Sequence, residues 1–72
     1  MGYFSYHHTA KGMIRAGKLA GYYYTPRYRH IAPALVLLFR DSARPRMPIR
    51  AHRWAEYAPL LPPELECRTP PP

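Results

Sequence analysis

Cysteine, acidic residues and long apolar runs are all scarce in this chain of 72 residues. The single cysteine, Cys67, excludes an internal disulfide and a zinc site built from several thiolates. Only four residues are acidic, which leaves little material for a mechanism based on paired carboxylates. The longest apolar run, from Ile31 to Phe39, is interrupted by Pro33. It is shorter than the ~20 residues that a membrane-spanning helix needs. We therefore expect no cofactor, no metal and no membrane partner.

The length of the chain allows one domain, which buries only about 60% of the surface that the unfolded chain exposes. Aromatic residues make up 14% of the sequence, including seven tyrosines and one tryptophan. These large side chains favour a compact core over disorder. The amino-terminal residues show no charged segment followed by a long apolar stretch, so we expect no signal peptide and a cytoplasmic location.

Positive charge dominates, because 11 lysines and arginines face 4 acidic residues and give a formal net charge of +7. Such an excess attracts nucleic acid, anionic membrane surfaces and acidic proteins. It also serves plain solubility, so the charge alone leaves the partner open.

The first structural signal is a helix between Thr9 and Gly17. Thr9 is a suitable N-cap, and Gly17 is the residue type found just past a helix end. Ala10, Met13 and Ile14 follow the spacing of one helical face, which should lie on the core.

Three later segments have strand character. The tyrosines 22–24 form a β-favouring run that we expect Pro26 to end, because proline cannot donate a hydrogen bond to a sheet. The segment Ala34–Phe39 is apolar at every position, which predicts a central strand or one covered on both faces. Residues 47–49 can add a short strand, with Pro48 restricted to an edge or bulge.

A second helix is expected over Ala51–Ala58, stopped by Pro59. Trp54 and Tyr57 lie on one face of it; this spacing is typical of core residues, although both rings could instead stack on bases. The sequence thus predicts a small α+β domain over residues 1–63, in the order helix, two or three antiparallel strands, helix, with the helices packed on the sheet. Residues 64–72 read as a proline-rich, mobile tail.

Several blocks of the sequence resemble a known group of proteins. They are Tyr3–His7, Thr9–Lys11, Gly17–Leu19, Ile31–Leu37 and Met47–Leu61. The pattern is similar to short bacterial proteins, common in gut clostridia and their relatives, that are often named thermostable hemolysin delta-VPH. That group often has an acidic residue where Ala51 stands, and is less basic between Arg27 and Arg46. The name implies a membrane-active protein, but neither expected helix has the character of a long membrane-surface amphipath.

Arg50, His52 and Arg53 cluster at the start of the second expected helix. Helix N-termini attract anions, and guanidinium groups add paired donors, so these residues are candidates for an anion-binding site. The alternative is a solvated face in which Arg53 pairs with Glu56 at (i, i+3) spacing.

A second candidate site combines aromatic rings with cations. Tyr22 and Tyr24 lie on the same expected strand, and Arg27 and Arg29 follow directly. Stacking platforms interleaved with phosphate-binding cations are typical of proteins that bind single-stranded nucleic acid.

The composition favours a non-enzymatic binding or regulatory module that engages an anionic partner. Four histidines, at positions 7, 8, 30 and 52, could serve as metal ligands, but His7 and His8 are adjacent and do not share a helix face. The other possible ligands, Asp41, Glu56 and Cys67, are scattered, so we expect no metal site. Two alternatives stay open: a protein-interaction subunit that acts as a homo-oligomer, and the membrane-active protein that the resemblance implies.

Overall fold

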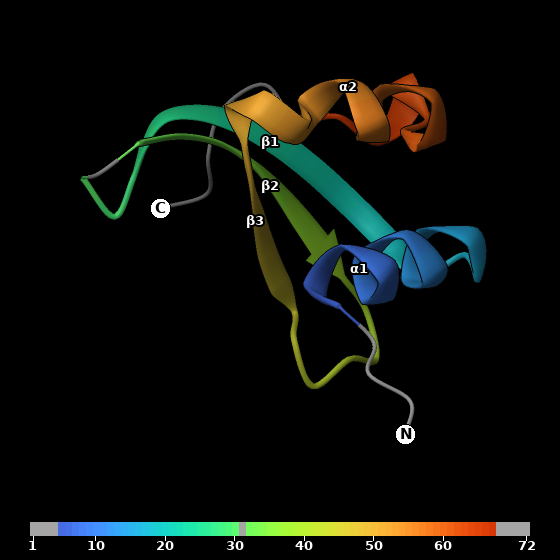
Figure 1. Cartoon of the computed structure of the whole chain (residues 1–72). Coiled ribbons are helices and arrows are strands. Elements are labelled where there is room, and N and C mark those ends of the chain that lie inside the picture. The colour runs from blue at the N-terminus through green and yellow to red at the C-terminus, as the bar shows by residue number, and fades with distance from the viewer. Residues whose placement is uncertain (1–4, 31, 68–72) are drawn as a thin grey trace.

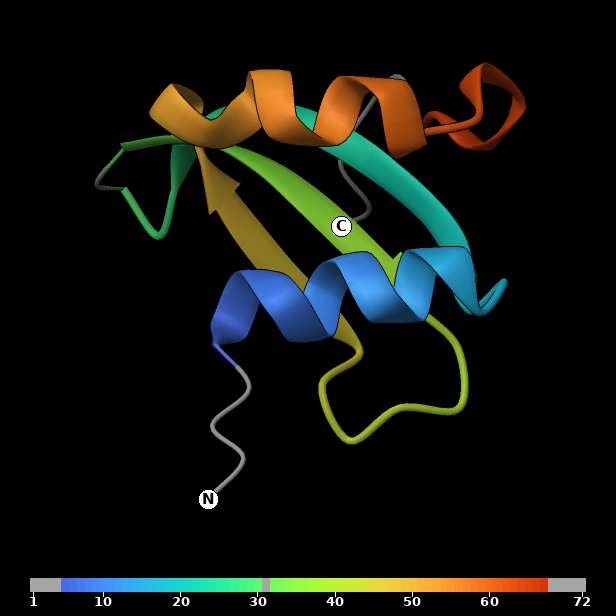
Figure 2. The same ribbon diagram turned by 45° about the vertical axis from the view of Figure 1, so that its right-hand side comes forward.

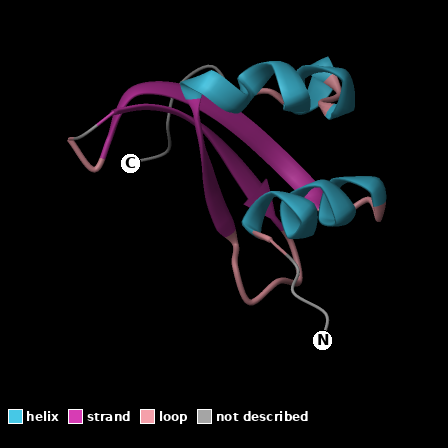
Figure 3. Cartoon of the chain, viewed as in Figure 1, coloured by secondary structure: helices cyan, strands magenta, loops and turns pink. Residues whose placement is uncertain are grey.

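A helix, a three-stranded sheet and a second helical segment follow one another in the part of the chain that the computed structural model describes, residues 5–30 and 32–67 (Figures 1 and 3). The helix α1 spans Tyr6–Arg15, and the strands are β1 (Leu19–Tyr28), β2 (Ala32–Phe39) and β3 (Arg46–Arg50). The sheet is antiparallel in the order β1-β2-β3. This arrangement confirms the predicted α+β class. No helix in the described residues is both long and apolar enough to cross a membrane.

One face of the sheet carries both helical segments, as Figure 2 shows. Between them and the sheet lies the main core. Its largest fully buried side chains on this face are Tyr57, Leu35, Leu37, Met47 and Ile49. Ala10 of α1 is fully buried there too, with Met13 and Ile14 packed against the cluster, so the predicted apolar face of the first helix is confirmed.

The central strand β2 is buried on both of its faces. Leu35, Val36 and Leu37 all have no exposed surface, although successive side chains point to opposite sides of a sheet. Val36 belongs to a second, smaller cluster with Tyr23 and Ala34 on the face away from the helices. The prediction of a central strand is therefore confirmed.

The first helix begins earlier than the sequence suggested. The cap is Ser5, whose Oγ accepts a hydrogen bond from the backbone N–H of His8 at 3.1 Å, and Thr9 lies inside the helix. Both residues are competent caps, but starting at Tyr6 lets that side chain join the core. At the other end Gly17 has a φ of +79°, the left-handed conformation expected just past a helix.

The expectation that Pro26 ends the first strand was wrong, because β1 continues to Tyr28. Its position at the sheet edge explains this: an edge residue can lack a donor without breaking the ladder. The pairing with β2 also shifts register between Thr25 and Tyr28, which places Pro26 in the irregular stretch.

The second helix is not one α-helix over Ala51–Ala58. It consists of a 3-10 turn (Ala51–Arg53), the short α2 (Trp54–Tyr57) and another 3-10 turn (Ala58–Leu60) that contains Pro59 at its start. Proline fits the first turn of a helical piece, so Pro59 begins a new turn instead of stopping the segment. Tyr57 is fully buried and Trp54 partly buried, as expected for core residues, and the indole Nε1 donates to the carbonyl of Ile49 at 2.8 Å.

Both edges of the sheet carry covering contacts. At β1, the N–H of Cys67 donates to the carbonyl of Tyr22 at 2.7 Å, and Glu66 forms a parallel bridge with the same tyrosine. At β3, Pro48 has no N–H, and its carbonyl accepts from the Tyr6 hydroxyl at 3.1 Å. The residues after Pro63 that are described thus lie along β1, while 68–72, the rest of the predicted mobile tail, fall outside the described residues.

A matched pair of glycine substitutions tests this contact along β1. A Cβ at Gly21 would lie 3.2 Å from the carbonyl oxygen of Leu65 and 3.3 Å from Sγ of Cys67, whereas Gly12 has open space around it. We expect Gly21→Ala to destabilise the fold by about 1 kcal/mol and to speed the reaction of Cys67 with a thiol reagent. Gly12→Ala should stabilise it by about 1 kcal/mol through helix propensity and leave the thiol rate unchanged. Equal thiol rates in both variants would show that the contact is not maintained in solution.

Candidate anion-binding pocket

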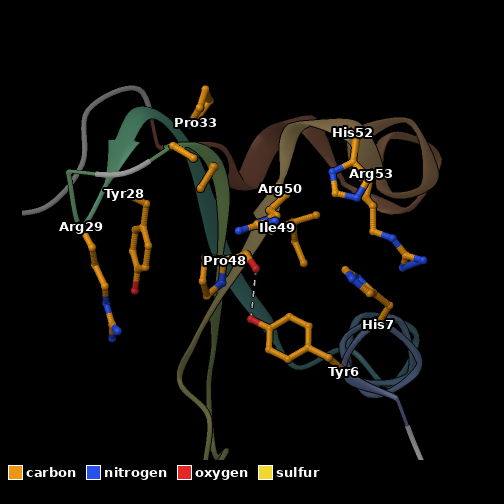
Figure 4. A pocket seen from close by; sticks show the side chains of 12 residues that line it. Tyr6, His7, Tyr28, Arg29, Pro33, Pro48, Ile49, Arg50, His52 and Arg53 are labelled. Atoms are coloured by element: carbon orange, nitrogen blue, oxygen red, sulfur yellow. Dashed lines mark hydrogen bonds between the residues drawn. The ribbon is translucent and has the colours of Figure 1, made fainter.

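A pocket of about 530 Å³ opens where the start of α1, the β1–β2 turn and the end of β3 meet (Figure 4). We call it the basic pocket. Its described lining residues are Tyr6, His7, Tyr28, Arg29, Ala32, Pro33, Ala34, Pro48, Ile49, Arg50, His52 and Arg53. In the view of Figure 4, Tyr28 and Arg29 stand on one side of β3, and His7 and Arg53 on the other.

Small side chains on β2 create the first half of this hollow. Side chains of cross-strand partners point to the same face, so Arg50 lies opposite Ala34, and Pro48 opposite Val36, on the face away from the helices. Along that face of β2, valine gives way to the alanines 34 and 32. Neither alanine can fill the space beside Tyr28, which packs against the same cluster. The pocket is thus a consequence of side-chain size on a buried strand.

The second half lies around the edge of β3, where the chain enters the helical segment. His52 and Arg53 belong to the 3-10 turn after β3, and His7 comes from the first turn of α1. The hydrogen bond from Tyr6 to the carbonyl of Pro48 holds α1 against the strand at this point.

Three arginines and two histidines line the basic pocket, and none of its described lining residues is acidic. The structure therefore brings Arg50, His52 and Arg53 together as predicted, and adds Arg29 from the second candidate site. The helix N-terminus invoked for this site is absent from the geometry, because the segment opens with a 3-10 turn and α2 has only four residues. Side chains, not a helix dipole, supply the positive charge.

The three arginines differ in their present partners. Arg29 stacks over the ring of Tyr28, with 5.5 Å between Cζ and the ring centroid. Arg53 approaches Glu56 at 3.5 Å, which confirms the expected (i, i+3) pair. Arg50 is exposed and makes no ion pair with any described residue. It is the arginine most available to a ligand.

The remaining residues of the predicted stacking strand do not form a platform. Tyr22 is only 5% exposed and belongs to the core, so it cannot stack on a base. Tyr24 is 41% exposed, but Trp54 contacts it edge-on, with 5.0 Å between ring centroids. Arg27 is exposed and does not line the basic pocket. The sequence could not predict that Tyr22 is buried and that Tyr24 contacts Trp54, because the alternation of side chains along a strand does not show which of them face the helices.

Tyr6, His7 and Tyr28 were not among the predicted site residues. His7 is remote from the others in sequence, so only the packing of α1 against β3 reveals it. Tyr28 had a local signal, its position beside Arg29 in a basic stretch, which the expectation of a strand end at Pro26 obscured.

A hydrogen-bonded network connects the basic pocket to the core. Nδ1 of His7 lies 2.7 Å from the hydroxyl of the fully buried Tyr57, and Nζ of Lys11 lies 2.9 Å from a carboxylate oxygen of Glu56. Burial, and next the positive charge of Arg53, lowers the pKa of His7, whereas burial raises the pKa of Tyr57 to about 12. The Lys11 hydrogen bond holds the pKa of Glu56 below its usual range. These shifts favour the neutral phenol, the neutral imidazole and the ionised carboxylate.

The β1–β2 turn has strained backbone. Arg29 and His30 have φ values of +53° and +62°, the left-handed region that side chains with a Cβ disfavour. Strain of this kind concentrates at functional sites, and here one of the two residues lines the basic pocket.

Replacing His30 by glycine should relieve this strain. The left-handed conformation costs about 1–2 kcal/mol for an ordinary residue, against about 0.5–1 kcal/mol of extra chain entropy for glycine. We expect His30→Gly to raise the free energy of unfolding by about 0.5–1 kcal/mol, measured by urea denaturation, and Arg29→Gly to raise it less, because that variant also loses the contact with the Tyr28 ring. A loss of stability in His30→Gly would show that its side chain makes a contribution larger than the strain.

The lowered pKa of His7 predicts a pH dependence. A histidine whose pKa is lower in the folded than in the unfolded state, near 6.5, binds fewer protons when folded, so stability rises with pH up to about that value. The groups that surround His7 are Arg53, Glu56, Lys11 and His52, and the lowered pKa of Glu56 places its own titration below this range.

We expect the wild-type protein to be more stable at pH 7.5 than at pH 5.5, by urea denaturation at both values, and His7→Gln to flatten this difference. His8→Gln, at the neighbouring exposed position, is the control and should keep it. An unchanged difference in His7→Gln would assign the dependence to another group.

The described residues contain no group of three or more side chains placed to hold a metal ion. Comparisons with protein-family models, with curated proteins and with solved structures find no match to this chain.

Proposed function

We propose that this protein is a small, non-enzymatic binding or regulatory module that engages an anionic partner through the basic pocket. The observation that carries the proposal is that Arg29, Arg50 and Arg53 all line one pocket whose described lining residues include no carboxylate. These residues come from two separate parts of the chain, so the fold, not sequence proximity alone, gathers them.

The donor set of the basic pocket suits a negatively charged group. Guanidinium groups present paired N–H donors that match phosphate and carboxylate oxygens, and they stay charged at any physiological pH. His7 and His52 add imidazole donors on the same side as Arg53 (Figure 4). The net charge of +7 adds a long-range attraction that brings such a partner to the surface.

The character of the walls supports a ligand that is more than a bare ion. Tyrosine, proline, alanine and isoleucine side chains form most of the lining. Ligand sites commonly combine such apolar walls with a few placed polar groups, at volumes of roughly 300–1,000 Å³. The pocket therefore fits a partner that carries both an anionic and an apolar part.

The homo-oligomer stays a prediction, and the covered edges of β1 and β3 give it no added support. The membrane-active alternative likewise stays a prediction that rests on the resemblance. We propose neither as the function, because no contact or cavity in the described residues favours them.

Neutralising Arg50 tests the proposal directly. We expect pyrophosphate to bind the full chain in isothermal titration calorimetry, more weakly as salt increases. Arg50→Gln should weaken this binding about tenfold or more, since a hydrogen bond to a charged group contributes ~1.5–3 kcal/mol. Arg15→Gln is the matched control: it removes the same charge from the last turn of α1, outside the pocket, and should have little effect. Equal losses of pyrophosphate affinity in the two variants would show that binding depends on net charge and not on the pocket. Undetectable binding by the wild type would overturn the proposal.

A further inference from the structure

We infer that the basic pocket recognises a nucleoside phosphate, with the base against Tyr28 and the phosphate between Arg50 and the group formed by His7, His52 and Arg53. This inference rests on the proposed function and names the class of ligand for the same site. The same chemical unit occurs in a free nucleotide and in single-stranded nucleic acid, and the experiment below separates the two sources.

The side of the pocket that contains Tyr28 is built from flat surfaces. In Figure 4 the Tyr28 ring stands between Arg29 and Pro48, and Pro33 projects from the other side of β2. The guanidinium of Arg29 stacks on the ring at 5.5 Å, so one face of Tyr28 is occupied by a cation and the other is turned toward the pocket. A planar heteroaromatic base stacks on such a ring, whatever its identity, because every base has a π-face.

The alanines 32 and 34 leave the space that a base would occupy. They sit on the same face of the sheet as Tyr28 and Pro48, and longer side chains at either position would project into the hollow. A hollow bounded by the Tyr28 ring and Pro48 has room for a rigid planar group.

The other side of the pocket holds the groups that bind phosphate. His7, His52 and Arg53 stand together there, and the exposed Arg50 lies between them and Tyr28 (Figure 4). The base and the phosphate of a nucleotide are held apart by the sugar. A ligand with these two ends would therefore satisfy the planar side and the basic side of the pocket at once.

The test compares adenosine diphosphate with pyrophosphate, which has the same phosphate unit without the base. Stacking on an aromatic ring contributes enough to predict that adenosine diphosphate binds about fivefold to a hundredfold more tightly, measured by calorimetry on the full chain. Adenosine alone should bind far more weakly than either. Equal affinities for adenosine diphosphate and pyrophosphate would overturn this inference and leave the anion-binding function intact, whereas failure of both ligands to bind would overturn the two together.

Variants assign the preference to the planar side. Tyr28→Phe keeps the ring and should keep the preference for adenosine diphosphate, whereas Tyr28→Leu and Ala32→Leu should abolish it while pyrophosphate affinity stays the same. If Tyr28→Leu loses pyrophosphate binding as well, its circular dichroism and denaturation midpoint decide whether its fold failed, and Ala32→Leu then provides the test of the planar side. A preference that survives Ala32→Leu in a folded protein would contradict the proposed position of the base.

A 5′-phosphorylated oligoadenylate of six nucleotides distinguishes the two sources. Tighter binding than adenosine diphosphate, with a steeper loss of affinity as salt rises, would identify single-stranded nucleic acid, because a longer backbone releases more counterions. Weaker binding than adenosine diphosphate would identify a free nucleotide. Either result identifies the source only where the preference for adenosine diphosphate over pyrophosphate has been measured, because net charge alone can tighten the binding of a longer backbone.

Discussion

The burial of β2 on both faces is the constraint on which the rest of this structure depends. Leu35, Val36 and Leu37 lie side by side in the chain with no exposed surface, so apolar cover is needed above and below the strand. A chain of 72 residues has only one layer of helix to offer. It places α1 and the 51–60 segment on one face and leaves tyrosine, proline and the chain around Cys67 to cover the other. The face of β2 away from the helices is therefore covered by few side chains, as expected for a domain of this size.

The basic pocket arises where this thinner cover ends. Along the face of β2 away from the helices the side chains shrink from valine to alanine, and the space that they leave is bordered by Tyr28, Pro48 and Arg50. The thicker side contributes too, because His7 reaches the pocket from α1 while it is bonded to Tyr57 in the core. The bond between His7 and Tyr57 is one of the contacts between α1 and the helical segment. The hydrogen bond between His7 and Tyr57 thus links the surface of this protein to its core.

Local sequence patterns predicted the elements of this fold better than its site. The helix face of Ala10, the two-faced burial of β2 and the short strand around Pro48 follow from periodicity, which reflects local geometry. The ends of the elements were harder to predict from the sequence. Ser5 and Thr9 can both cap a helix, and Pro26 is tolerated inside β1 only because β1 is an edge strand. The cluster of Arg50, His52 and Arg53 was visible because its members are neighbours in sequence. The contribution of His7 and Arg29 was not, because it depends on which segments pack together.

Three unfavourable features coincide at the basic pocket, and their coincidence is itself an argument for function. Like charges gather there without a carboxylate among the described lining residues, the turn at Arg29 and His30 holds left-handed backbone, and a histidine is kept below its ordinary pKa. Each feature lowers stability in a domain that has little to spare. A site selected only for folding would favour glycine in the left-handed turn, and it would leave no arginine without an acidic partner, whereas Arg53 has Glu56 and Arg50 has none among the described residues. Features that lower the stability of the fold are expected at ligand-binding sites. A ligand that binds the folded state stabilises it, and so offsets the stability that these features cost. On the proposed function, an anion bound beside Arg50, which makes no ion pair with any described residue, would offset that charge, so a feature that costs stability in the free protein would contribute to affinity.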